Sequence, residues 1–199
     1  MLAAAIASFA SNLPGWLLAF GMWFLIWTPL VALLEYATHR WIMHMANRLL
    51  DPRLDQHKAH VTHHGGANDD EFVNMPLKNC LLLSSPFLLL IVGWGLVAGS
   101  PTSVIIPAAA FLSWSFVYTY LWTVIHRAIH GVEHNWFRRI GPAFRFFRNH
   151  HLRHHVHAHG NYGTVFPLTD YVFFTWLGGD VRPRRIVMRR RSKTKRARA

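Results

Sequence analysis

Cysteine is nearly absent from this chain: Cys80 is the only one among 199 residues. A single thiol excludes an internal disulfide framework, a cysteine-rich zinc module and an iron–sulfur centre held by thiolates. The H-E-x-x-H motif of zinc proteases is also missing, as is the Glu-x-x-His pattern with which soluble helical bundles hold two iron ions. Acidic residues are few, 9 against 21 Lys and Arg. The side chain that is abundant is histidine, with 15 copies.

Long apolar runs are the second abundant feature. Hydrophobic residues make up 52% of the chain and are concentrated at residues 13–34, 81–97 and 104–125. Each run approaches the ~20 helical residues that cross a bilayer, and none carries a charge, which would cost about 2.5–3.5 kcal/mol at its centre. The turn at residues 99–101 makes the last two runs a helical hairpin. We expect an all-α membrane bundle of about three to four spans.

The histidines lie outside these runs, and counting the crossings places them on one side of the membrane. The hairpin crosses out and back, so the chain returns to the side on which the first run ends. That side also carries most Lys and Arg, whereas the hairpin tip carries none, and the positive-inside rule therefore predicts a cytoplasmic helical cap. The clusters are His39 and His44; His60, His63 and His64; His126 and His130; and His151, His154 and His155.

The spacing within the clusters suits helices. Residues three or four apart share a helix face, so each H-x-x-H-H motif can deliver two or three imidazoles to one place. His39 and His44 are five apart and need a π-bulge, a kink or a frayed helix end to align. Ten imidazoles exceed the four ligands of a tetrahedral zinc and suit two metals with about five nitrogens each. Imidazole binds iron, zinc and copper, so ligand type leaves the metal open.

Four residues near the clusters are candidates for supporting roles. His134 and His157 are possible additional ligands or hydrogen-bond partners. Glu35 and Glu133 are possible outer partners that orient imidazoles.

The basic residues are concentrated at the C-terminal end. Ten of the 21 lie between Arg182 and Arg198. We predict a membrane-embedded domain over residues 1–181 and a disordered basic tail over residues 182–199, close to anionic lipid headgroups. Because the rest of the chain suits a bilayer, no nucleic-acid partner is expected.

Several segments resemble, in order and spacing, those of a known superfamily. They are EYATHRWIMH (35–44), HVTHH (60–64), DEFVNMP (70–76), HRAIH (126–130), NHHLRHH (149–155) and NYGTVFPLTDYVFFT (161–175). Together they resemble the fatty acid hydroxylase / sterol desaturase superfamily of membrane di-iron oxygenases, and most closely its fatty acid 2-hydroxylase type. The closing segment departs from the usual pattern at Thr169 and Phe174, where Trp and Gly are usual.

The resemblance implies two iron ions held by the ten clustered histidines, activation of O2, and hydroxylation of a lipid acyl chain, either a fatty acid or the acyl group of a sphingolipid. Zinc is possible in a purified sample. No cytochrome b5-like domain precedes the spans, so a separate electron donor is expected, such as cytochrome b5 or a ferredoxin. The first run and the hairpin, at residues 16–34 and 111–122, are expected to line the acyl channel.

Two alternatives remain. The same fold serves oxidation, desaturation or hydroxylation of sterols and carotenoids. A membrane metal transporter is the non-enzymatic alternative, although a transporter should carry polar ligands inside its spans, and these spans lack His, Asp and Glu until their predicted cytoplasmic ends.

Overall fold

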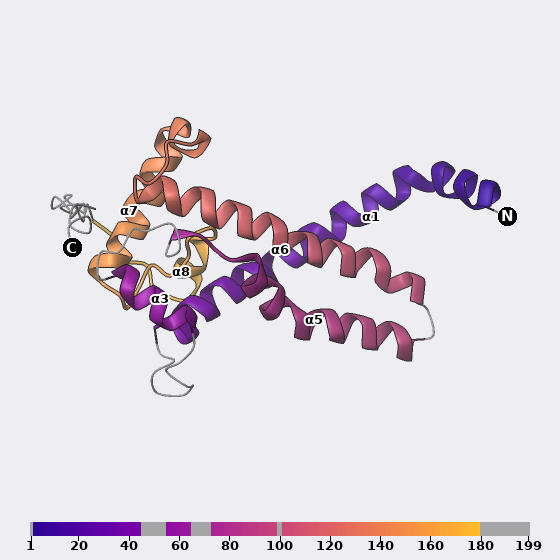
Figure 1. The fold of residues 1–199 in the computed structure, drawn as a ribbon, viewed down its shortest axis with the longest axis horizontal. Helices are drawn as coiled ribbons and strands as arrows, with labels where there is room; N and C mark the ends of the chain where they lie inside the picture. The colour runs from indigo at the N-terminus through magenta and orange to yellow at the C-terminus, as the bar shows by residue number, and fades with distance from the viewer. Residues whose placement is uncertain (1, 45–54, 65–72, 99–100, 180–199) are drawn as a thin grey trace, which may run out of the picture.

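The computed structural model describes residues 2–44, 55–64, 73–98 and 101–179 (Figure 1). All regular structure in these ranges is helical, as the sequence predicts. The predicted basic tail, residues 182–199, lies outside the described residues, so its boundary with the folded domain stays a prediction.

Three helices are long and apolar enough to cross a membrane, at Asn12–Met43, Leu77–Val97 and Val104–Ile129. The first consists of α1 (Leu2–Ala37) from Asn12 onward, together with residues Thr38–Met43 that continue it. The others are α5 (Leu77–Val97) and α6 (Pro101–Ile129). The protein is therefore an integral membrane protein. Prolines occur inside all three helices and interrupt none of them, because neighbouring helices in a bundle can satisfy the freed backbone groups.

The spans pack through aromatic and small polar side chains. The hydrophobic core between α1, α5 and α6 centres on Val31, Phe111 and Trp114. The Trp114 indole donates to the carbonyl of Phe24 at 2.7 Å, and the buried hydroxyls of Ser84 and Ser115 join α5 to α6 at 2.8 Å. Such interhelical hydrogen bonds stabilise a membrane bundle by about 0.6–2 kcal/mol each.

The remaining elements form a cap at one end of the bundle. They are η1 (Thr38–Met43), which continues α1, then α3 (Asp55–His64), η2 (Trp136–Ile140), α7 (Pro142–Val156) and α8 (Leu168–Val172). Figure 1 shows α3, α7 and α8 gathered at the end of α1 that is remote from the N-terminus. The ends of α1 and α6 thus meet the cap on the same side, as an even number of crossings requires.

Candidate metal centre

A short π-helix solves the spacing problem of the first histidine pair. Residues Thr38–Met43 form η1, in which each turn holds more residues than an α-helix does. His39 and His44, five residues apart, consequently lie on one face, and their rings stack with centroids 5.3 Å apart. Of the three possibilities that the sequence left open, the π-bulge is the one that occurs.

Each H-x-x-H-H motif delivers two imidazoles to one place, within the two or three that its spacing allows, and its third imidazole to a second place. The structure thus divides each motif between two groups. On α3, His60 and His64 join one group and His63 the other. The reason is angular: at about 100° per residue, position i+4 lies ~40° to one side of position i, and position i+3 lies ~60° to the other side. A helix lying between two groups therefore contributes to both.

The same division on α7 completes two groups of five imidazoles. Within each group the nitrogens that could hold an ion lie within 4.8 Å of one another. We call them group A and group B. Group A consists of His39, His44, His60, His64 and His154, and group B of His63, His126, His130, His151 and His155.

The nitrogens in each group face one another at short range. In group A, Nε2 of His44 lies 2.9 Å from that of His60 and 3.0 Å from that of His154. In group B, Nε2 of His126 lies 3.1 Å from the same atom of both His63 and His151. The backbone identifies the protonated nitrogens: Nδ1 of His39, His126 and His154 pairs with a carbonyl oxygen.

This arrangement fits a bound cation. When Nδ1 carries the proton, Nε2 presents a lone pair. Several lone pairs at ~3 Å repel one another in a dry site unless a positive ion lies between them. Two neutral five-nitrogen sets, free of thiolate, are suitable for iron, copper or zinc. The chemistry of the donors therefore supports a metal in each group.

Burial keeps these imidazoles neutral. Desolvation, followed by the neighbouring imidazoles, lowers the pKa of His64 to about 4 and that of His130 to about 3. The same two causes lower the pKa of four others: His60, His151, His154 and His155. Neutral imidazole is the form that binds metal, so protons do not compete for these nitrogens at neutral pH.

The carbonyls that orient group A come from one loop, residues 160–166. Nδ1 of His39 pairs with the carbonyl of Tyr162, and Nδ1 of His154 donates to that of Gly160 at 2.8 Å. In group B, Nδ1 of His126 faces the carbonyl of Val73 at 3.2 Å. Backbone carbonyls of this kind fix the tautomer and direction of a metal-binding imidazole.

Two buried carboxylates hold this loop, each at a different part of it. Glu35 on α1 accepts the amides of Thr164, Val165 and Phe166 at 2.8–3.1 Å. It was a candidate for an outer partner that orients imidazoles, and its contacts are with the loop whose Tyr162 carbonyl faces His39. The hydroxyl of Tyr118 donates to it as well, at 3.2 Å.

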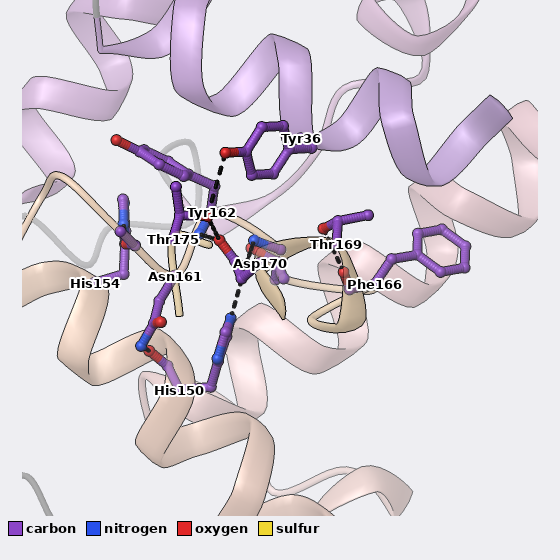
Figure 2. Close-up of polar contacts among 12 residues, drawn as sticks. Tyr36, His150, His154, Asn161, Tyr162, Phe166, Thr169, Asp170 and Thr175 are labelled. Carbon is purple, nitrogen blue, oxygen red and sulfur yellow. Dashed lines mark hydrogen bonds and ion pairs between the residues drawn. The ribbon is translucent and has the colours of Figure 1, made fainter. Parts of the chain in front are cut away.

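Asp170 on α8 is the second carboxylate (Figure 2). It accepts the amides of Tyr162 and Gly163 at 2.9 and 2.8 Å, the hydroxyl of Thr175 at 2.7 Å, and Nε2 of His150 at 3.1 Å. Burial alone would raise the pKa of this carboxyl, but the four hydrogen bonds together lower it. A side chain at Gly163 would collide with the carbonyl of Phe166, since a Cβ would lie 2.4 Å from that oxygen.

No pattern in the sequence pointed to a role for Asp170, His150 or Asn161. Asn161, drawn with His150 in Figure 2, is fully buried in a left-handed conformation, φ 57°. Its side chain pairs with the backbone of His150 and of Leu177. All three lie in or beside the quoted segments 149–155 and 161–175, which were the available signal. Hydrogen bonds to the backbone leave no spacing pattern in the sequence, so the roles of these three residues become visible only in the structure.

The remaining candidate residues lie outside both groups. Arg138 donates to the exposed His134 at 2.9 Å. His157 is exposed after the end of α7. Glu133 was expected near the imidazoles, but its carboxylate forms a surface ion pair with Arg127 at 2.8 Å.

An apolar pocket leads from the spans to group A. Its cavity volume is about 50 Å³, and α1, α5 and α6 provide most of its walls. His39 lines it at the cap end, and Ser84 and Ser115 line it within the bundle. Both stretches that were predicted to line the channel contribute to the pocket. Residues 16–34 contribute only from Val31 onward, whereas residues 111–122 contribute from Phe111. Helix α5 adds Cys80 and Leu83. The residues that line the pocket are mostly apolar: Val31, Leu34, Glu35, Thr38, His39, Met43, Met75, Cys80, Leu83, Ser84, Phe111, Trp114, Ser115, Tyr118 and Trp122.

Comparison with known proteins gave one match. The profile of the fatty acid hydroxylase family matches residues 17–175, which include most of the first span, the other two spans and both histidine groups. No curated protein and no solved structure matches the chain.

Proposed function

The chain belongs to the fatty acid hydroxylase family, and from that premise we propose that it is an O2-dependent di-iron hydroxylase of lipid acyl chains. Membership makes it a lipid-processing membrane oxidoreductase of the hydroxylase and desaturase type. The observation that carries the finer proposal is the apolar pocket between the spans, which reaches group A at His39, beside a second group of five imidazoles.

We assign the ten histidines of groups A and B as the ligands of two iron ions. The donor set fits iron, and zinc can occupy the same nitrogens in a purified sample. When bound, iron would supply the activation of O2 that oxidation of an unactivated C–H bond requires. The protein supplies placement, because five neutral imidazoles fixed by helices and carbonyls need little rearrangement.

The pocket is suited to the hydrocarbon part of a substrate. An acyl chain lying among Val31, Phe111 and Trp114 would be shielded from water. The end of the chain nearest His39 would lie beside group A. Enclosure by three spans allows a lipid to enter from the bilayer rather than from water. The pocket therefore favours a lipid whose reacting carbon lies near the membrane surface.

The electron donor would be a separate protein, such as cytochrome b5 or a ferredoxin, acting from the cytoplasm. Support for this orientation comes from the charges. Arg127, Arg138, Arg139, Arg145 and Arg148 lie on the cap side of the described chain, and the positive-inside rule favours the cytoplasm for such a side.

Lipid analysis of cells that express the chain tests the proposal. We expect new lipids that carry one additional oxygen, derived from isotopically labelled O2. A loss of two hydrogens would indicate desaturation, and a sterol or carotenoid product would indicate the other branch of the superfamily.

A matched pair of histidine variants gives the control. His154→Ala removes a buried member of group A and should abolish the product and lower the bound metal. His134→Ala changes an exposed histidine outside both groups and should leave both unchanged. Full product formation by the His154 variant would refute the ligand assignment.

A further inference from the structure

Residues 168–174 form a two-sided segment on the surface of the cap. On one side, Thr169 and Asp170 are buried and belong to the framework of the loop 160–166. On the other side, Leu168 is 71% exposed, Val172 66% and Phe174 95%. In water, this concentration of large apolar side chains in one short segment would be unfavourable.

The backbone adds a second observation. Phe174 adopts a positive φ of 54°, a conformation that residues other than glycine, asparagine and aspartate rarely adopt. The conformation directs an aromatic ring outward instead of into the protein. Strain of this kind persists where the surroundings or a function demand it, and exposure to water provides no such demand.

Contacts with α1 fix the depth of this segment. Phe173 stacks on Tyr36 with ring centroids 4.4 Å apart, and the hydroxyls of Tyr36 and Thr175 lie 3.2 Å apart (Figure 2). Tyr36 stands in the last part of the membrane span Asn12–Met43. The apolar side chains consequently lie near the cap end of this span, where Tyr36 also packs against the half-exposed Trp41, with ring centroids 6.5 Å apart.

We propose that residues 168–174 lie in the interfacial layer of the lipid bilayer, with Leu168, Val172 and Phe174 inserted among the lipids. The segment packs against Tyr36 at the cap end of α1, where Leu33 is 44% exposed, so its apolar side extends the membrane contact of that helix. Short amphipathic segments and aromatic rings are typical of this layer. A lipid surface also explains the outward Phe174, since its ring gains burial that the protein does not provide.

The scarcity of cysteine makes a direct test possible. In a Cys80→Ala background, Phe174→Cys provides one thiol for an environment-sensitive fluorophore, and Leu168→Cys provides a second position on the same side. Both residues are exposed, so substitution removes little packing. The full chain is reconstituted in phosphatidylcholine vesicles, and far-ultraviolet circular dichroism confirms that each variant keeps its helices.

Two control positions calibrate the measurement. Leu89→Cys on α5 is 72% exposed within a span and reports lipid. Ala158→Cys in the exposed loop after α7 reports water. At 168 and 174 we expect blue-shifted emission, quenching by lipids with a nitroxide near the top of the acyl chain, and loss of quenching by aqueous iodide. Labels that behave like the one at 158 would overturn the proposal, as would labels shielded from both quenchers, which would indicate a protein partner or a second copy.

Discussion

Replacing Asp170 by Asn should weaken metal binding in group A more than in group B. Asp170 holds the amides of Tyr162 and Gly163, and the carbonyls of this loop orient His154 and His39, both in group A. The substitution keeps the shape of the side chain but replaces one acceptor oxygen by a donor. Group B should be affected less, because the carbonyl that faces its His126 belongs to Val73, outside this loop.

The expected magnitude follows from the lost hydrogen bonds. At least one buried amide would lack an acceptor, and the remaining bonds would lose the strengthening that a charged acceptor gives. Together these losses correspond to about 2–5 kcal/mol of folding stability. Disturbing an outer partner of a metal ligand typically weakens metal binding ~10–100-fold, and we expect that loss in group A.

Competition with a chelator, followed by measurement of metal per chain, checks this prediction. Asp170→Asn should retain the ion of group B and lose that of group A. Combined with His63→Ala, which disables group B, it should remove nearly all metal; combined with His64→Ala, it should change little more. Glu133→Gln, which alters an exposed carboxylate 50% open to solvent, is the control. Equal loss from both groups, or from neither, would show that the loop does not act selectively.

Three further predictions concern the groups and the pocket. His63→Ala and His64→Ala alter neighbouring residues but should each lower the metal content by about one of two ions, from group B and group A respectively; identical residual sites in metal-binding titrations would contradict the division. Ser84→Phe should lower turnover of long acyl chains about tenfold or more, since overpacking costs about 1–3 kcal/mol, whereas Ser85→Phe, outside the pocket lining, should not; equal effects in a chain-length assay would exclude the pocket as the substrate site. The metal-free protein should lose stability as pH falls from 6.5 toward 4, because unfolded His64 binds protons in that range while burial lowers the pKa of folded His64 to about 4; thermal unfolding without metal at several pH values measures this loss, and an unchanged midpoint would contradict it.

Much of the architecture follows from simple sequence rules. Three uncharged runs predict three spans, and an even number of crossings predicts one common side for the histidines. The five-residue spacing of His39 and His44 required an irregular helix, and η1 is one. These predictions succeed because they depend on length, charge and parity, which are local or countable properties of the chain.

The way each H-x-x-H-H motif divides between the two groups could not be predicted, for a geometric reason. Positions i+3 and i+4 count as one face of a helix, yet they lie ~100° apart around its axis. Whether they point at one group or at two depends on how α3 and α7 pack, and the spacing of His60, His63 and His64 does not contain that information. The role of Asp170 was not predicted, and Glu35 was named only as a possible outer partner, because both accept hydrogen bonds from backbone amides, which leave no pattern in the sequence.

The continuity of α1 with η1 has a consequence for the membrane itself. The helix that crosses the bilayer runs directly into η1, which carries His39 and ends beside His44, so no loop separates the span from these two histidines. A change in bilayer thickness is commonly accommodated by tilting such a helix. Tilting α1 would displace two imidazoles of group A relative to His154 on α7, so the thickness of the surrounding membrane becomes a variable that sets the geometry of the site.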